Sequence, residues 1–291
     1  MEQVKLGRYG SVVKFRTEDG IMLGGMLFRN AMAPKTCMIF VHGMSGSMLS
    51  GISLAIAKGL GNDGALFSFN NRGCGLVASF AKYARGRKRR LMAGTNLERF
   101  EDCIYDIKGA VDSMSKLGYA EFILIGHSTG CQKAAYYMHA TRDKRIAGIV
   151  LVAPCDDYNL NKEGLGKGYN KIKALCLKMI KSGKGNEAAP GAFGLSAQRL
   201  DSLIDERRVE ARMFDYNGIL KEFSSINIPI LVIFGAEEEN TIKPVGTCLS
   251  ILESRTSSGK FNELIIPGAN HVFEGKEKTL ANKIKKWIRM I

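Results

Sequence analysis

The sequence predicts an α/β fold: a mostly parallel, eight-stranded sheet with helices on both faces and an inserted helical cap. Three observations predict this fold. Continuous apolar runs of strand length alternate with stretches in which apolar residues recur at helical spacing, as in chains that build parallel sheets. A glycine-rich turn at residues 126–130 joins one such run directly to a helix-prone stretch. Between residues 155 and 226 the alternation stops, and only helix-prone sequence remains.

The core elements follow from these patterns. Two early segments alternate apolar and polar residues around a Glu-Asp-Gly turn, which predicts a hairpin. Fully apolar runs predict buried strands, because strands covered on both faces lack the alternation. The expected strands are 10–17, 21–28, 36–42, 65–70, 122–125, 146–153, 228–235 and 261–266, and the expected core helices are 48–60, 97–117, 131–139, 244–252 and 276–290.

Segment 155–226 is predicted to be a helical cap inserted between two core strands. Its candidate helices cover residues 170–181 and 196–209, and glycines and prolines interrupt the sequence between them. The core is then formed by residues 1–154 together with residues 227–291.

The composition is that of an ordinary globular protein with a basic excess: 45% of the residues are hydrophobic, 24% are charged, and the net charge is +14. No apolar run is long enough to cross a bilayer, so we expect no membrane span. The first residues lack the apolar stretch of a secretion signal. Seven scattered cysteines without a Cys-x-x-Cys pair favour free thiols in a reducing compartment. We therefore expect a cytoplasmic protein with no metal site.

The densest basic cluster begins at Lys82 and ends at Arg90. We interpret it as a solvated surface loop, because runs of charge usually face water. No helix-turn-helix, RNP or zinc pattern accompanies it, so nucleic-acid binding is not expected. The cluster leaves open the hypothesis that an anionic substrate is attracted to this surface.

Ser128 lies in the sequence Gly-His-Ser-Thr-Gly, between an apolar run and a helix-prone stretch. This context is the one that a nucleophile elbow requires, because the sharp turn forces the serine into a strained conformation and leaves no room for flanking side chains. The following helix begins at the serine, and its free N–H groups and partial positive charge favour an oxyanion there. Ser128 is therefore the predicted nucleophile.

A serine hydroxyl needs a general base, and the chain has four histidines. His271 follows the last strand in a turn that can reach the carboxyl edge of the sheet, and it is the predicted base. We expect the ring of His127, in the elbow itself, to point away from it. His139 lies too far down the helix, and His42 ends a strand, where a structural role is expected.

The acid that orients the base is expected after the strand that ends at residue 235. Three carboxylates follow there, and Glu238 stands at the expected position, with Glu239 as the alternative and Glu237 not excluded. Such a carboxylate would hold the imidazole tautomer and stabilise the imidazolium. Asp156 and Asp157, after the preceding strand, form a fallback acid site.

Backbone N–H groups are expected to form the oxyanion hole. One belongs to Thr129, directly after the nucleophile, and the other to Met44, in the loop that follows Val-His-Gly. Glycines at positions 43 and 46 would let this loop approach a substrate closely.

With Ser128, Glu238 and His271 in this chain order, the sequence resembles the α/β-hydrolase superfamily. The resemblance covers residues 10–287 apart from the cap, and it rests on His-Gly at 42–43, Asn-Arg-Gly-Cys-Gly at 71–75, the elbow, and Gly-Ala-Asn-His at 268–271. Within it, the elbow and Ser-Ala-Gln-Arg-Leu-Asp-Ser-Leu at 196–203 are similar to a group that includes fungal siderophore ester hydrolases. The chain departs from most members at Glu238, where they carry aspartate.

The resemblance implies a serine hydrolase that cleaves carboxylic esters through an acyl-enzyme, without a metal or organic cofactor. Its partner would be a small-molecule ester, with anionic and aromatic substrates both open. A thioesterase, an amidase or a peptidase would use the same triad, and the motifs do not separate them. A hydrolase fold kept as a non-catalytic binding protein is the remaining alternative.

Overall fold

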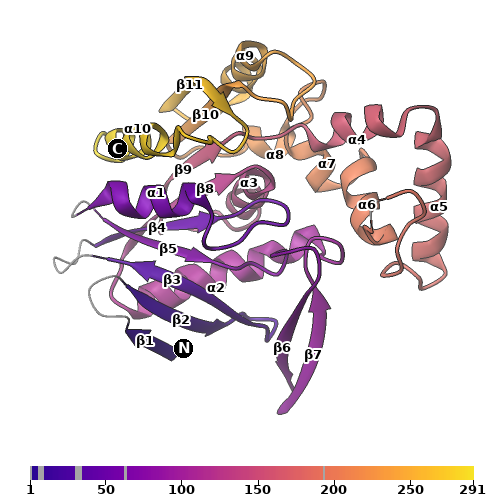
Figure 1. The fold of residues 1–291 in the computed structure, drawn as a ribbon, viewed down its shortest axis with the longest axis horizontal. Helices are drawn as coiled ribbons and strands as arrows, with labels where there is room; N and C mark the ends of the chain where they lie inside the picture. The colour runs from indigo at the N-terminus through magenta and orange to yellow at the C-terminus, as the bar shows by residue number, and fades with distance from the viewer. Residues whose placement is uncertain (1, 6–9, 30–34, 62–63, 193) are drawn as a thin grey trace.

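The computed structural model describes residues 2–5, 10–29, 35–61, 64–192 and 194–291. Within them the central sheet has nine strands in the order β1-β2-β3-β5-β4-β8-β9-β10-β11 (Figure 1). The strands are β1 (Glu2–Lys5), β2 (Ser11–Arg16), β3 (Met22–Phe28), β4 (Thr36–Val41), β5 (Ala65–Phe69), β8 (Glu121–His127), β9 (Ile146–Val152), β10 (Ile230–Glu237) and β11 (Phe261–Asn270). From β5 to β11 every neighbouring pair is parallel, whereas β1, β2 and β3 pair antiparallel.

The predicted fold class is confirmed. Eight of the strands correspond to the predicted eight, and β1 extends the sheet at its antiparallel edge. Both faces carry helices: α1 and α10 pack together on one face, with α2 and α3 on the other (Figure 1). These helices are α1 (Gly51–Leu60), α2 (Cys103–Lys116), α3 (Thr129–Thr141) and α10 (Glu277–Ile288), while α9 (Val245–Arg255) precedes β11 and a short 3-10 turn, η2 (Phe100–Asp102), precedes α2. Because of this cover, β5 is buried along its whole length.

In the described residues 155–192 and 194–226 the regular elements are helices. The helices are α4 (Asp157–Leu165), η3 (Gly166–Gly168), α5 (Tyr169–Lys181), α6 (Ala197–Ile204), α7 (Val209–Met213) and α8 (Lys221–Ser224). They divide between two hydrophobic clusters. Cys176, Leu200 and Leu203 belong to a small cluster of their own, whereas Phe214 and Phe223 belong to the core of the sheet. The part that stands away from the sheet is therefore α4 to α6, on the right of Figure 1.

The basic segment was expected to be a surface loop, and this expectation is wrong. Residues 78–93 form a separate antiparallel hairpin of β6 (Ala78–Ala84) and β7 (Arg87–Ala93), which projects from the body of the protein (Figure 1). Its two turn residues, Arg85 and Gly86, have φ angles of 49° and 72°. Positive φ at both positions suits the twist of a two-residue hairpin turn, but arginine rarely adopts it, so the turn was not evident in the sequence.

None of the described helices is long and apolar enough to cross a membrane. All seven cysteines lie in the described part of the chain as free thiols.

Candidate active site

Ser128 sits at the bend between β8 and α3 with φ 56° and ψ −132°. This conformation is sparsely populated for residues other than glycine, and it persists only when the surroundings enforce it. The neighbouring glycines are required by space. A Cβ atom on Gly126 would lie 2.4 Å from the Gly130 carbonyl oxygen, and one on Gly130 would lie 2.0 Å from the Val41 oxygen. The Gly-x-Ser-x-Gly pattern thus follows from the close packing of β8, α3 and β4.

The loop after β4 lies against the nucleophile. A Cβ atom on Gly43 would lie 2.7 Å from Cβ of Ser128 and 3.2 Å from its hydroxyl oxygen. Met44 follows, and its half-buried side chain packs on the small cluster of α5 and α6. Ser45 then donates its backbone N–H to the Thr95 hydroxyl at 2.6 Å, which anchors the loop. Thr129, one predicted oxyanion donor, is the first residue of α3 and directly follows Ser128, and Met44, the other, directly follows Gly43.

His271 and the two candidate acids meet at the end of β11. The His271 ring nitrogen Nδ1 lies 2.7 Å from Oε1 of Glu238, while the backbone N–H of His271 donates to Oε2 of Glu239 at 3.1 Å. Glu238 therefore contacts the imidazole, and Glu239 holds the main chain that carries it. The fallback acids have other hydrogen-bond partners than His271: Asp156 caps α4 by accepting from Asn159, and Asp157 accepts from Gln132 at 2.8 Å.

Cys155 lies between the nucleophile and the base, and the sequence analysis did not assign it to the site. Its sulfur is 3.2 Å from the Ser128 hydroxyl and 3.8 Å from Nε2 of His271. No direct hydrogen bond joins Ser128 and His271, both of which are described. Burial raises the pKa of the Cys155 thiol well above its usual range, so the group is neutral. Its position directly after β9, at the edge where the site forms, is the signal that could have found it.

The expectation that the ring of His127 points away from the base is wrong. Its Nε2 atom lies 2.9 Å from the backbone oxygen of His271, and the two ring centroids are 5.1 Å apart. Burial, with the neighbouring His271, lowers the pKa of His127 to about 4, so its neutral ring supports the turn that holds the base. His42 is buried and structural, as expected: it accepts from the N–H of Asn71, and its Nδ1 lies 2.9 Å from the oxygen of Gly43.

Buried polar groups continue from the elbow helix into the cap. Burial, with the neighbouring Glu210, raises the pKa of Asp157 to about 6. One turn along α3, the fully buried Lys133 pairs with Glu98 at 2.8 Å. Arg199 of α6 lies 3.5 Å from the same carboxylate and also pairs with Glu210. The nucleophile's helix and the cap are thus joined by charged groups that are shielded from water.

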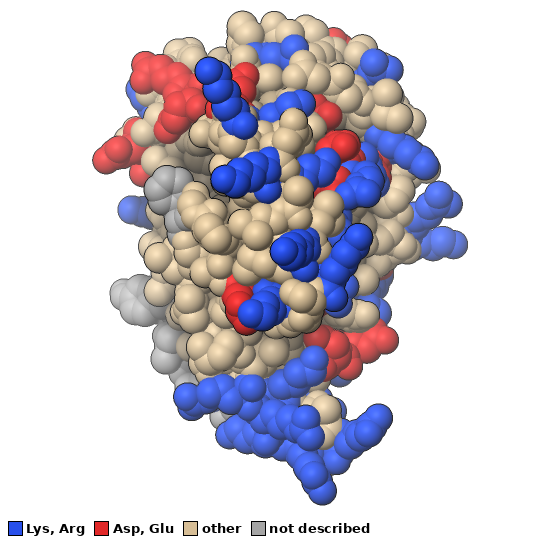
Figure 2. Space-filling view, turned by 90° about the vertical axis from the view of Figure 1, so that its right-hand side faces the viewer, with Lys and Arg blue, Asp and Glu red and all other residues tan. Residues whose placement is uncertain are grey.

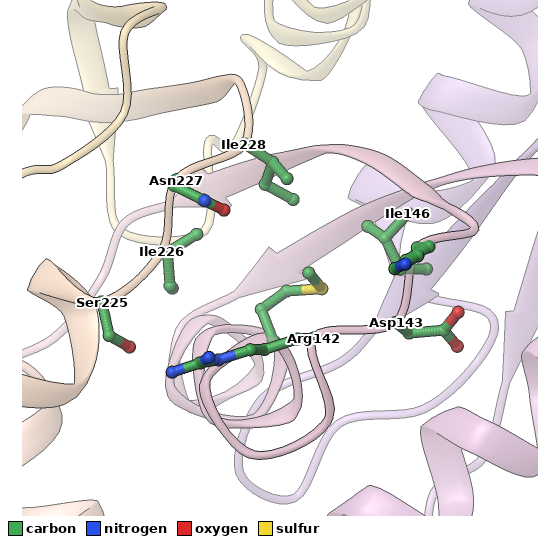
Figure 3. Close-up of a pocket in the computed structure, with 9 residues that line it drawn as sticks. Arg142, Asp143, Ile146, Ser225, Ile226, Asn227 and Ile228 are labelled. Atoms are coloured by element: carbon green, nitrogen blue, oxygen red, sulfur yellow. The ribbon is translucent and has the colours of Figure 1, made fainter.

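A separate hollow of about 510 Å³ lies at the other edge of the sheet (Figure 3). It is lined by Met138, Arg142, Asp143, Lys144, Ile146, Ser225, Ile226, Asn227 and Ile228. These residues come from the end of α3 and the amino ends of β9 and β10, and none of the predicted site residues is among them. Ligands of parallel α/β sheets bind outside the carboxyl ends of the strands, where Ser128 and His271 lie, so this hollow is not the candidate site.

Similar solved structures share the architecture. The siderophore hydrolase EstB from Aspergillus fumigatus superposes with a TM-score of 0.64 at 18% identity, covering 92% of this chain and 94% of its own. Est1E from Butyrivibrio proteoclasticus with bound ferulic acid has a TM-score of 0.63 at 16% identity, covering 95% and 98%. The esterase Pf2001 from Pyrococcus furiosus has a TM-score of 0.60 at 16% identity, covering 97% and 92%. At these identities the likeness establishes the α/β-hydrolase fold and not the activity.

Sequence comparison with curated proteins finds no match. One protein family does match, over residues 95–290, and is described as a protein of unknown function, DUF1749. The matched region contains Ser128, Glu238 and His271, together with the whole cap segment. This chain, with its α/β-hydrolase fold, belongs to the DUF1749 family.

Proposed function

We propose that this protein is a serine hydrolase that cleaves carboxylic esters through an acyl-enzyme. Ser128 attacks the ester carbonyl while His271 accepts its proton, and Glu238 stabilises the imidazolium. The N–H groups of Met44 and Thr129 stabilise the oxyanion. His271 then protonates the leaving alcohol, and a water molecule activated by the same histidine releases the acid. These steps need no cofactor.

One observation carries this proposal. The strained elbow presents Ser128 at the same edge of the sheet as His271, whose ring is hydrogen-bonded to the Glu238 carboxylate. Strain at a single residue persists where function requires it, and a histidine held by a carboxylate in one tautomer is what a general base needs. The similar structures named above are esterases and a siderophore hydrolase, which favours an ester over a thioester or amide.

The position of Cys155 adds one step. The Ser128 hydroxyl is within hydrogen-bond distance of the Cys155 sulfur, and this sulfur lies beside Nε2 of His271. Rotation of the serine side chain would exchange the sulfur for the imidazole, a much better proton acceptor. We assign this exchange to substrate binding, because geometry of this kind often tightens only in the substrate complex.

The proposed substrate is a small-molecule ester, in keeping with the ferulic acid bound in Est1E. Two tyrosines of the cap segment form hydrogen bonds within the protein: the Tyr216 hydroxyl donates to the oxygen of Pro154, and the Tyr169 hydroxyl donates to the oxygen of Ile204. An anionic acid or alcohol portion would be favoured by the net charge of +14. The seven free thiols are the reason to place the protein in the cytoplasm, a reducing compartment.

The test is hydrolysis of p-nitrophenyl esters from short to long acyl chains by the wild type, Ser128→Ala and the control Ser254→Ala. Ser254 lies exposed on α9, far from the site. We expect turnover in the wild type and the control, loss in Ser128→Ala, and fluorophosphonate labelling that maps to Ser128. Equal turnover in all three proteins, or labelling at another residue, would overturn the proposal.

A further inference from the structure

The hairpin of β6 and β7 concentrates positive charge that its own sequence does not balance. Six of the nine residues from Lys82 to Arg90 are lysine or arginine, and residues 64–97 contain no aspartate or glutamate. Figure 2 shows these cations gathered at the lower end of the molecule, where Figure 1 places the hairpin. We call residues 76–92 the basic ribbon.

These charges do not stabilise the fold. Among the described residues, Lys82 pairs with Asp19 at 3.6 Å, and the five arginines and lysines from Arg85 to Arg90 pair with no carboxylate. The strand register also places Lys82 directly opposite Arg89. Like charges at opposed positions of an antiparallel pair are destabilising. A cluster that weakens its own hairpin indicates a partner outside the chain.

The basic ribbon also exposes large apolar side chains. Leu76, Val77 and Met92 are 62%, 56% and 51% exposed, and Tyr83 is 38% exposed. Leu76, Val77 and Met92 lie toward the base of the ribbon, whereas Tyr83 lies with the cations toward its tip. A hollow of about 360 Å³ on the ribbon is lined by Ser79, Phe80, Ala81, Lys88, Arg89 and Arg90. Cations over a concave surface concentrate the field that attracts an anionic group.

The charged surface extends beyond the ribbon. The face shown in Figure 2 carries further lysines and arginines across the cap, above the ribbon. The exposed lysines on and next to η3 and α5 are Lys167, Lys171, Lys178 and Lys181. Two separate elements thus present cations on one broad side of the molecule, which suits an extended anionic surface.

We propose that the basic ribbon docks this protein onto an anionic lipid bilayer. Lysine and arginine near such a surface are attracted by its negative potential, and exposed apolar side chains enter the boundary between headgroups and acyl chains. A nucleic acid would use the cations but would gain little from Leu76, Val77 and Met92. The combination of charge and apolar exposure therefore favours a lipid surface.

Docking would also bring the candidate site to the bilayer. At the base of the ribbon, Gly75 donates to the oxygen of Gly46, and Thr95 accepts from the N–H of Ser45. Gly46 and Ser45 belong to the loop that approaches Ser128. The surface proposed here thus goes beyond the hydrolase activity and does not depend on it.

The test is co-sedimentation of the full-length protein with phosphatidylcholine vesicles that contain either no anionic lipid or about 30% phosphatidylglycerol. We expect binding to the anionic vesicles alone, weakened as salt rises from about 0.1 M to 0.5 M. The variant with Arg87, Lys88, Arg89 and Arg90 all changed to alanine should lose on the order of 100-fold in partitioning. Leu76→Ser/Val77→Ser/Met92→Ser should lose several-fold at the higher salt.

The matched control changes the exposed Lys58, Lys278, Lys283 and Lys286 of α1 and α10 to alanine, which removes the same number of charges from another face. It should retain binding within about threefold. Thermal unfolding monitored by circular dichroism verifies that each variant folds, without reference to esterase activity. An equal loss in the control, binding to neutral vesicles, or tighter binding to a DNA or RNA duplex in the same buffer would overturn the proposal.

Discussion

The sheet and the cap are held by different forces. The interior of the sheet is apolar: Ile39, Phe67 and Leu124 are fully buried and belong to one continuous cluster. The part of the cap that stands away from the sheet has a much smaller apolar cluster. Its links to the core include charged side chains, because Arg199 of α6 lies beside Glu98, which also pairs with Lys133 of α3.

This difference suggests that the apolar contacts stabilise the fold, whereas the buried ion pairs orient the cap. Apolar contacts are strong but not directional, whereas ion pairs are directional and carry a desolvation penalty when buried. Lys133 lies on the helix that begins at Ser128, so the buried charges set the cap against the nucleophile's own helix. The sheet then provides rigidity and the edge that carries Ser128 and His271, while the buried ion pairs hold the cap in place against it. Four predictions test this division.

The largest effect is expected at the catalytic edge. Glu238→Gln should lower kcat about 10³–10⁴-fold with the fold intact, because an amide no longer holds the His271 tautomer or stabilises its charged form. Glu239→Gln is the matched control, since its carboxylate accepts from the backbone N–H of His271 and not from the ring. It should lose less than about tenfold. A reversed order of the two losses would assign the acid to Glu239.

Breaking the ionic link of the cap should cost stability. Arg199→Met should lower the free energy of unfolding by about 3 kcal/mol, because it leaves Glu210 buried without its cation. Arg199→Met/Glu210→Leu should recover part of this loss. Lys108→Met, which removes an exposed pair with Asp112, should cost less than about 1 kcal/mol. Urea denaturation measures all three, and a double variant as unstable as the single one would contradict the charge argument.

The pH dependence of stability should reveal that the buried His42, directly after β4, is neutral. Burial, with the nearby Lys133, lowers the pKa of His42 to about 4, below the value near 6.5 of an unfolded histidine. A depressed pKa adds stability above pH 6.5, and that stability is lost as the pH falls toward 4. The wild type should therefore lose about 2 kcal/mol more than His42→Gln between pH 7.5 and pH 5. Parallel stability curves for the two proteins would show that His42 is not held neutral.

The smallest effect is expected at Cys155, where the cap segment leaves the sheet. Cys155→Ala should speed fluorophosphonate labelling of Ser128 about threefold, because a weak hydrogen bond to sulfur no longer competes with His271. Cys155→Ser should restore the slower rate, since a hydroxyl can replace the thiol as partner. The second-order labelling rates measure the effect. Slower labelling in Cys155→Ala would mean that the thiol assists the nucleophile instead.

The hairpin of β6 and β7 shows where prediction from the sequence fails. Its turn places Arg85 at positive φ, and cations occupy positions where alternation would otherwise be visible. The hairpin also forms hydrogen bonds with the core, such as the donation from Tyr83, near its tip, to the oxygen of Gly20. Such contacts join residues far apart in sequence, so no local pattern records them.

By itself, the sequence determined the order of eight strands of the central sheet and of the helices that cover them, the elbow at Ser128 and the turn that carries His271, because each depends on local periodicity or on glycine. The tertiary structure alone decided which carboxylate meets the imidazole. A register shift between Gly235 and Glu237, where β10 pairs with β11, sets the direction of the residues that follow. It also placed the Cys155 sulfur between Ser128 and His271, and it turned His127 toward the base. These outcomes depend on how β8, β9, β10 and β11 lie side by side, and sequence spacing carries no information about the distances between strands.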